Sequence, residues 1–298
     1  MNSGKILIVS STHGNEINPV WSVNQYSKQG NIIDKNIEYK FIIGNPLAYE
    51  KGCRYIDKDL NRSFNLIKNN HDTSIYEIRR ANFLVEKFGV NGSEPCDIAI
   101  DLHTTTANMG TSIVMYGRRE KDFCLAALLQ HKFGLPIYLH EKDEKQTGFL
   151  VEAWPCGLVI EIGPVAQNFY DPKIINRFLI IISSLREEIN KLKNKQKQLP
   201  KLVIVHVHQG SIDYPRGEDG NINALIHPKR MNQDWKPIKK GDPLFMDMEG
   251  CTKSYNGKNT LWPVFIGEVA YKEKNIAMSY TKKEVINLPT QICEDFFN

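Results

Sequence analysis

The segment Ser-Ser-Thr-His-Gly-Asn-Glu at residues 10–16 places His13 and Glu16 three residues apart, directly after an apolar run. Catalytic zinc sites take three protein ligands, often two His and one carboxylate, and leave a fourth position for water. His103, far along the chain in the segment Asp-Leu-His, supplies the third ligand. We therefore predict a zinc site made of His13, Glu16 and His103. The alternative is a His and a Glu at a helix start, with His103 as a separate core residue.

The other histidines offer one competing metal site. His206 and His208 alternate along an apolar segment, so they share one face of an extended strand. No carboxylate or third His clearly completes that pair. We expect four histidines to be ordinary loop or helix residues: His71, His131, His140 and His227.

Two carboxylates lie in apolar segments close to the predicted ligands. Asp101, two residues before His103, is on the same side of an extended strand and is suited to holding a ligand in place. Glu161 follows Leu-Val-Ile, where a buried carboxylate is costly unless it is paired, hydrogen-bonded or used in chemistry. We interpret Glu161 as the general base that takes a proton from a zinc-activated water. A salt bridge to an internal Arg is the alternative.

The segment Cys-Arg-Tyr-Ile-Asp-Lys-Asp-Leu-Asn-Arg at 53–62 gathers charge on one loop. A guanidinium binds a carboxylate in bidentate fashion and also stabilises an oxyanion. Arg54 and Arg62 are therefore candidates for substrate binding, and Asn61 adds an amide donor next to Arg62. A surface charge cluster is the alternative interpretation.

The elements that must position these residues follow from the apolar runs. Strands are predicted at 5–11, 39–46, 96–103 and 156–164, and helices at 75–89, 123–134 and 172–198. Continuous apolar strands that alternate with helices are typical of an α/β domain with a largely parallel sheet. Because functional residues gather at the carboxyl ends of such strands, we expect the four polar strand ends to meet at one crevice.

The pattern changes near residue 200, where Gly, Pro and Asn begin to separate short strand-like segments. We predict a zinc-binding catalytic α/β domain at 1–200. A smaller, β-rich domain at 201–298 is predicted to contribute to the active-site cleft.

Composition limits the classes of function and the compartment. The chain has 298 residues and a formal net charge of +4, which does not indicate a nucleic-acid partner. Its six cysteines form no Cys-x-x-Cys pair, as is usual for a reducing compartment. The longest apolar stretch, at 178–185, is shorter than the roughly 20 residues of a membrane span. We expect a soluble, cytoplasmic protein with no membrane or nucleic-acid partner. A homo-oligomer is possible.

Five segments, in chain order, closely resemble the aspartoacylase family, which is grouped with the succinylglutamate desuccinylases among zinc carboxypeptidase-like enzymes. They are THGNE, CRYIDKDLNRSF, DLHTTTANMG, IEIGP and PVFIGEVAYKEK. The resemblance covers most of the chain. It implies a mixed, largely parallel sheet with helices on both faces, followed by the smaller β-rich domain.

The resemblance also implies an activity. One zinc ion per subunit would be bound by His13, Glu16 and His103. The enzyme would hydrolyse an N-acyl amino acid, typically N-acetyl-L-aspartate, to a carboxylate such as acetate and a free amino acid. The alternatives are a deacylase for other N-acyl amino acids, a succinylglutamate desuccinylase, and a zinc-binding protein without catalysis.

Further roles come with the resemblance. Arg54 would polarise the scissile carbonyl, Asn61 and Arg62 would hold the α-carboxylate, and Glu161 would act as general base and acid. Tyr271 would reach back to the substrate from the C-terminal domain, although the sequence alone suggests a packed strand residue.

One stretch departs from the family pattern. The animal enzymes carry a further Arg shortly before the catalytic Glu, where it grips the substrate's side-chain carboxylate. Residues 141–157 contain no Arg, and their only cations are Lys142 and Lys145. The apolar residues Phe149, Leu150 and Trp154 in this stretch favour a different acyl amino acid, so the side-chain preference stays open.

Overall fold

The structure is a computed structural model that describes residues 4–28, 37–66, 74–143, 146–194, 196 and 198–288. Its strands are β1 (Gly4–Ser10), β2 (Ile37–Ile43), β3 (Ile98–Thr104), β4 (Thr111–Tyr116), β5 (Ile137–His140), β6 (Cys156–Ile162), β7 (Leu202–Ile212), β8 (Ala224–Ile226), β9 (Pro243–Asp247), β10 (Thr252–Ser254), β11 (Trp262–Val264) and β12 (Met278–Asn287). Its helices are α1 (Asn18–Lys28), α2 (Pro46–Lys51), α3 (Tyr76–Phe88), α4 (Glu120–Phe133) and α5 (Pro172–Lys193), with 3-10 helices η1 (Leu60–Arg62), η2 (Leu150–Ala153) and η3 (Val269–Lys274).

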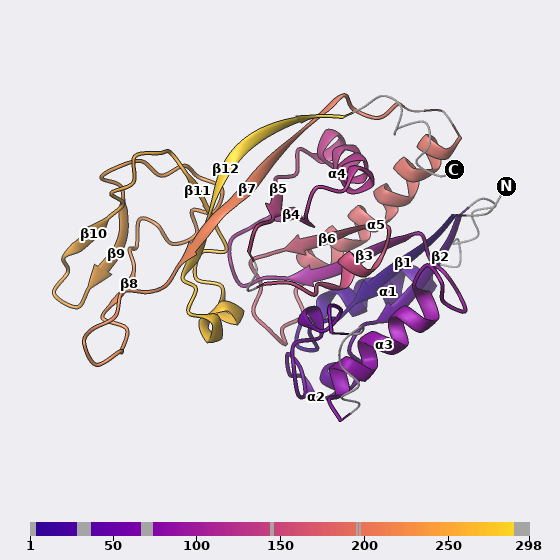
Figure 1. The fold of residues 1–298 in the computed structure, drawn as a ribbon, viewed down its shortest axis with the longest axis horizontal. Helices are drawn as coiled ribbons and strands as arrows, with labels where there is room; N and C mark the ends of the chain where they lie inside the picture. The colour runs from indigo at the N-terminus through magenta and orange to yellow at the C-terminus, as the bar shows by residue number, and fades with distance from the viewer. Residues whose placement is uncertain are drawn as a thin grey trace.

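A nine-stranded sheet in the order β11-β12-β7-β5-β4-β6-β3-β1-β2 forms the body of the molecule (Figure 1). The neighbours β2, β1, β3 and β6 are all parallel. β4 runs antiparallel to β6, and β12 runs antiparallel to both β7 and β11. The predicted mixed, largely parallel sheet is therefore confirmed.

Helices cover both faces of this sheet because successive strand residues point to opposite sides. Ile6 and Ile8 pack in a core that includes residues of α1, α4 and α5. Leu7 and Val9, from the same strand, pack in a second core with residues of α3. Strands buried on both faces explain why these segments read as continuous apolar runs in the sequence.

The C-terminal residues contribute to two sheets. β7, β12 and β11 extend the large sheet, whereas β8, β9 and β10 form a separate three-stranded sheet at the far end of the molecule (Figure 1). The large sheet thus continues across residue 200, in the connection between α5 and β7. A third apolar cluster lies under the small sheet. The division into domains at residue 200 stays a prediction.

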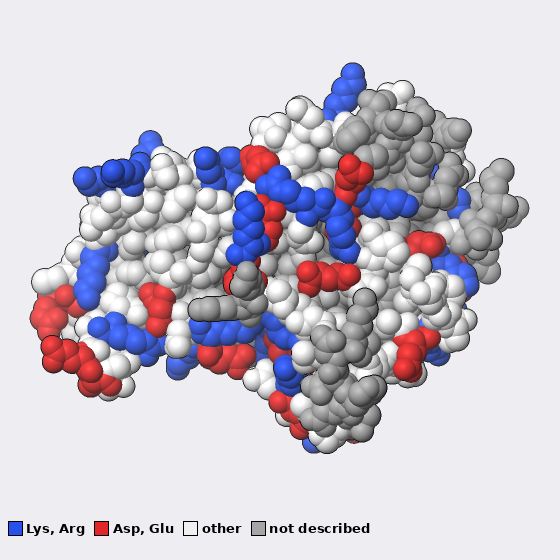
Figure 2. All heavy atoms as spheres, in the orientation of Figure 1, with Lys and Arg blue, Asp and Glu red and all other residues white. Residues whose placement is uncertain are grey.

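The predicted helices and strands are present with shifted ends. The helix predicted at 172–198 ends at Lys193. Tyr271 lies in η3 and not in a strand, so that expectation was wrong. No helix in the described ranges is long and apolar enough to cross a membrane. Acidic and basic side chains are interspersed over the face seen in Figure 2.

Candidate active site

The strands β2, β1, β3 and β6 are parallel neighbours, so the residues that follow each of them lie at the same edge of the sheet, as predicted. One pocket at this edge is lined by all eight predicted site residues: His13, Glu16, Arg54, Asn61, Arg62, His103, Glu161 and Tyr271. Seven of them come from the parallel half of the sheet and its loops, and Tyr271 comes from η3 of the C-terminal part. The structure therefore brings the whole predicted set together.

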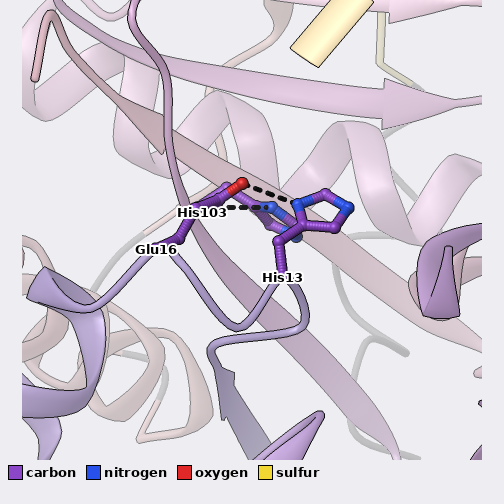
Figure 3. A group of neighbouring side chains, drawn as sticks. All are labelled: His13, Glu16 and His103. Carbon is purple, nitrogen blue, oxygen red and sulfur yellow. Dashed lines mark hydrogen bonds and ion pairs between the residues drawn. The ribbon is translucent and has the colours of Figure 1, made fainter. Parts of the chain in front are cut away.

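The carboxylate of Glu16 lies between the imidazoles of His13 and His103 (Figure 3). Its Oε1 is 2.6 Å from His13 Nδ1, and its Oε2 is 3.0 Å from His103 Nδ1. All three side chains are buried, and their candidate ligand atoms lie within 4.8 Å of one another. Among the described residues, this is the one group of three or more His, Cys, Asp or Glu side chains close enough to share a metal ion.

The outer nitrogens of both imidazoles face carboxylates. Asp101 Oδ2 lies 2.7 Å from His103 Nε2, and Asp59 Oδ1 lies 3.1 Å from His13 Nε2. Zinc-bound histidines usually donate their second ring N–H to a carboxylate, which fixes the ring and raises its basicity. Asp101 therefore has the position that the sequence predicted. Arg54 Nη2 also lies 2.8 Å from His13 Nε2, so that nitrogen either accepts from Arg54 or donates to Asp59.

The charges around these imidazoles suit a cation. Burial opposes charge on His103, yet the carboxylates of Asp101 and Glu16 raise its pKa well above the usual value. Burial also works against the charged form of Glu16, but His13 and His103 hold its pKa well below the usual range. A divalent ion held by His13, Glu16 and His103 would compensate the buried excess of carboxylate around the two imidazoles. The residues present fit a zinc ion.

Gly14 allows the loop that carries two of these residues to approach its neighbours. A Cβ at this position would lie 2.1 Å from the backbone carbonyl carbon of Ala48. The Gly14 N–H donates to the Arg54 carbonyl at 3.1 Å, which ties the two site loops together. Close approach to the backbone is thus the physical reason for a glycine between His13 and Glu16.

A buried glutamate that sequence reasoning missed anchors the loop between Arg54 and Arg62. Glu77, on α3, accepts hydrogen bonds from the backbone N–H groups of the three consecutive residues 56–58. Its Oε1 also accepts from Asn45 Nδ2 at 3.1 Å. The only sequence signal is a Glu on the apolar face of a helix. These contacts show that Glu77 holds the loop between Arg54 and Arg62 in position through its backbone.

Replacing Glu77 by Gln is therefore expected to lower kcat/KM by about tenfold or more, because an amide nitrogen would then face backbone donors that now meet a carboxylate oxygen. Steady-state kinetics and metal analysis on the same preparation provide the test. Zinc content should stay the same, because Glu77 does not contact the His-Glu-His group. Glu86→Gln, on the same helix, is the matched control and should leave the kinetics unchanged.

Asn61 and Arg62 occupy adjacent positions on η1. Asn61 Oδ1 accepts from the Leu150 N–H at 2.7 Å, which leaves its amide N–H groups for the pocket. Arg62 donates to the Asn61 carbonyl and, at 3.2 Å, to Gln146 Oε1. Its Nε is buried and has no hydrogen-bond partner in the described part of the chain. Both side chains therefore retain donors for an anionic ligand.

Glu161 lies opposite His103 in the register of β3 and β6. Its Oε1 is buried without a hydrogen-bond partner among the described residues, so the predicted alternative of an internal salt bridge receives no support there. Burial, together with the nearby carboxylates of Glu16 and Glu268, raises the pKa of Glu161 well above its usual value, although His103 works against this. An unsatisfied carboxyl next to the His-Glu-His group is placed for proton transfer.

A second residue that the sequence did not single out, Glu268, joins the C-terminal part to the site. Glu268 Oε2 accepts from the Thr106 N–H at 2.9 Å and from the hydroxyl of Thr105, in the loop that follows His103. Glu268 Oε1 accepts from the Ala270 N–H at 3.0 Å and so caps η3, which carries Tyr271. This glutamate therefore fixes the position of Tyr271 relative to β3.

The competing pair of histidines does not form a metal site in the part of the chain that the structure describes. His206 Nδ1 lies 3.1 Å from the Thr281 hydroxyl, and its ring packs against Trp235 and Trp262. His208 Nδ1 instead lies 2.7 Å from the Tyr138 hydroxyl. His71 lies outside the described residues. His140 is at the end of β5 and lines the pocket, so the expectation of an ordinary loop or helix residue was wrong.

Burial lowers the pKa of His206 to about 4, so this imidazole is neutral in the folded chain but takes up a proton on unfolding below about pH 6.5. The free energy of unfolding should therefore fall as the pH drops from 7 to 4.5, and His206 alone should account for about 2 kcal/mol of that loss. Urea unfolding of wild type and His206→Phe at the two pH values gives the difference. Equal losses in both proteins would contradict this prediction.

The stretch before Glu161 differs in part from expectation. Phe149 lines the pocket. Leu150 and Trp154 are buried in the core on the α3 side of the sheet, and the Trp154 indole donates to the Phe88 carbonyl. These two residues therefore do not contact a substrate in the pocket, contrary to the expectation from sequence. Lys142 is exposed at a neighbouring cavity, and Lys145 lies outside the described residues.

Comparison with known proteins identifies the family. Residues 2–189 match the family described as "Succinylglutamate desuccinylase/Aspartoacylase catalytic domain", and residues 201–283 match "AstE/AspA barrel-sandwich hybrid domain". The chain belongs to the succinylglutamate desuccinylase/aspartoacylase family. Membership makes it a hydrolase that acts on the amide bonds of N-acyl amino acids, as expected from the sequence.

Individual relatives agree with this assignment. A protein of Prochlorococcus marinus subsp. pastoris (strain MED4) named "Probable aspartoacylase" is 80% identical over 298 residues, which are 100% of both chains. Another "Probable aspartoacylase", from strain NATL1A, is 47% identical and covers 96% of this chain and 95% of its own. The crystal structure of murine aminoacylase 3 has a TM-score of 0.87 and 28% identity, over 97% of this chain and 98% of that one.

Proposed function

We propose that the chain is a zinc-dependent amidohydrolase that releases a carboxylate and a free amino acid from an N-acyl amino acid, with N-acetyl-L-aspartate among the candidate substrates. The observation that carries this proposal is the buried His13–Glu16–His103 group next to a carboxyl, Glu161, that has an unsatisfied oxygen. His13, Glu16 and His103 would hold the zinc ion, which would supply a water with a pKa lowered toward about 7 and a Lewis acid for a carbonyl oxygen.

The residues of the chain supply binding and proton transfer. Glu161 takes a proton from the attacking water and returns it to the leaving amine, for which its position in the pocket is suited. Arg54, held by Asp59 at 3.2 Å, donates to the carbonyl oxygen of the scissile amide as negative charge develops there. Asn61 and Arg62 bind the α-carboxylate, and Tyr271 donates to the substrate from η3.

The alternatives from sequence differ in the acyl group. Removal of a succinyl group and removal of an acetyl group use the same chemistry, so the same residues serve both. The small-molecule substrate agrees with the family, and a cytoplasmic location and a homo-oligomer remain predictions.

The test is amine release from a panel of N-acetyl, N-formyl and N-succinyl amino acids, each compared with its amide analogue that lacks the α-carboxylate. The wild-type protein should hydrolyse the N-acyl amino acids and should fail to hydrolyse the amide analogues that lack the α-carboxylate. Arg62→Ala should raise KM for the acids by about tenfold or more with a smaller change in kcat, because it removes a contact made in both ground and transition states. An unchanged KM would move the α-carboxylate site elsewhere.

A further inference from the structure

Three polar residues at the pocket have no role in the proposed reaction. Tyr138 and His140, both on β5, line the pocket, and the ring of His208 lies 4.8 Å from that of His140. The Tyr138 hydroxyl lies 3.1 Å from His140 Nδ1 and 2.7 Å from His208 Nδ1. Because one hydroxyl has one proton, Tyr138 donates to one imidazole and accepts from the other.

This chain of hydrogen bonds leaves one nitrogen of His140 for a ligand. The His140 side chain is 7% exposed, and its Nε2 is buried with no hydrogen-bond partner among the described residues. Asp143 Oδ2, at 3.8 Å, lies beyond hydrogen-bond distance. A buried nitrogen without a hydrogen-bond partner is destabilising, and a bound group in the pocket would remove that cost. Depending on the direction of the Tyr138 proton, Nε2 is a donor or an acceptor.

Aromatic rings surround this nitrogen. The rings of Tyr116 and Phe149 are stacked, with centroids 3.6 Å apart, and His140 lies 5.8 Å and 5.7 Å from them. The Arg62 guanidinium carbon is 4.0 Å from the Phe149 centroid. Two groups this close to one ring cannot share a face, so Phe149 separates Arg62 from Tyr116. His140 meets both rings edge to face, at interplanar angles of 66° and 68°, so aromatic carbon and one polar nitrogen line the space beside it.

The charges around the His140 ring disfavour an anion beside it. Burial, the neighbouring His208 and, to a smaller extent, the cations Arg62 and Lys274 lower the pKa of His140 to about 4, so its imidazole is neutral at pH 7. In the proposed reaction Arg62 is occupied by the α-carboxylate. Asp143 adds a carboxylate, which is itself bonded to Gln146 Nε2 at 3.1 Å. A buried anion without a paired cation is expensive. A side-chain carboxylate placed here would meet a neutral ring and a like charge.

We propose that His140, Tyr116 and Phe149 form the subsite for the side chain of the substrate amino acid, and that this subsite prefers an uncharged side chain with a polar end over a carboxylate. Amide, phenol and imidazole groups have this chemistry. The inference rests on the proposed function, because it takes the α-carboxylate to be held by Asn61 and Arg62.

Lys274 defines the competing assignment. Its Nζ is buried without a hydrogen-bond partner in the described ranges, and burial and Arg62 lower its pKa to about 8. Lys274 lines the neighbouring cavity with Arg62, Gln146 and His208, but it does not line the catalytic pocket. If the substrate carries a second carboxylate, Lys274 is a buried cation of the described ranges that is placed to bind it.

The test compares N-acetyl-L-asparagine with N-acetyl-L-aspartate, which have the same size and differ in charge. Zinc-loaded wild type should favour the asparagine compound by about tenfold or more in kcat/KM. His140→Phe keeps a ring but removes Nε2, and should lower kcat/KM for asparagine by about tenfold while N-acetyl-L-alanine is hydrolysed as before. His140→Gln should restore most of the loss. His206→Phe is the matched control, because it replaces a buried histidine outside the pocket. It should leave kcat/KM for the asparagine and alanine compounds unchanged.

The opposite pattern would overturn the inference: a preference for aspartate that Lys274→Met removes and His140→Phe leaves intact. If neither compound is hydrolysed, the proposed function fails. Calorimetric titration of the same two compounds then still measures the side-chain preference. In that measurement, equal or tighter binding of N-acetyl-L-aspartate would overturn the subsite, and tighter binding of the asparagine compound that His140→Phe abolishes would support it.

Discussion

Glu161→Gln is expected to reduce kcat by a factor of about 10²–10⁴ while zinc stays bound in the same amount. The amide of Gln has nearly the same shape as the carboxyl, so packing in β6 should be retained. It cannot accept the proton of the attacking water or return one to the leaving amine. The measurement is kcat from amine release, with zinc content determined on the same sample.

The expected size of this effect follows from the surroundings of Glu161. Its Oε1 has no hydrogen-bond partner among the described residues, so no other group there holds its charge in the resting state. Burial and the carboxylates of Glu16 and Glu268 raise its pKa, which brings a carboxyl closer to the range where a general base is effective at neutral pH. No histidine of the pocket lining replaces it, because His13 and His103 belong to the metal group and burial lowers the pKa of His140 to about 4, which makes its free nitrogen a poor base at neutral pH.

Glu284→Gln provides the control. Glu284 is a partly exposed residue of β12 that pairs with Arg118 at 2.8 Å and does not line the pocket. The same change of carboxyl to amide there should leave kcat within about twofold, as expected for a surface pair. Turnover that survives in Glu161→Gln would mean that another group acts as the base, and loss of zinc in that variant would mean that Glu161 supports the metal.

The sequence was sufficient to predict where the site residues meet. His13, Glu16, His103 and Glu161 all lie at the ends of apolar runs, and continuous apolar runs indicate parallel strands buried on both faces. Parallel neighbours end at one edge of a sheet, so four polar strand ends imply a shared crevice without knowledge of strand order. The strand order β6-β3-β1-β2 then accounts for the proximity of residues that are far apart in the chain.

The supporting residues could not be predicted in the same way. Glu77 acts through backbone N–H groups of a loop, and backbone donors have no signature in a sequence. Glu268 reaches Thr105 and Thr106 across more than 160 positions, so its role depends on how η3 docks on the loop after β3. His140 was misjudged because β5 is only four residues long, too short for its apolar pattern to stand out.

His103→Ala is expected to reduce bound zinc from about one ion per chain to a small fraction, and to abolish turnover, because two ligands do not complete a zinc site. His103 also joins Glu16 to Asp101, with 3.0 Å and 2.7 Å separating its ring nitrogens from the two carboxylates. Metal analysis after dialysis against a weak chelator measures the loss. The His206→Phe variant should retain its zinc, because His206 is a buried residue of β7 outside the pocket.

A graded variant separates loss of the ligand from loss of the fold. Asp101→Asn keeps the shape of the side chain and removes the charge that faces His103 Nε2, so zinc affinity should fall by about 10–100-fold without being abolished. The Thr12 hydroxyl donates to Asp101 Oδ1 at 2.6 Å and should continue to hold the side chain in place. Zinc affinity should therefore decrease in the order wild type, Asp101→Asn, His103→Ala. A His103→Ala protein that retains one zinc per chain would exclude His103 as a ligand.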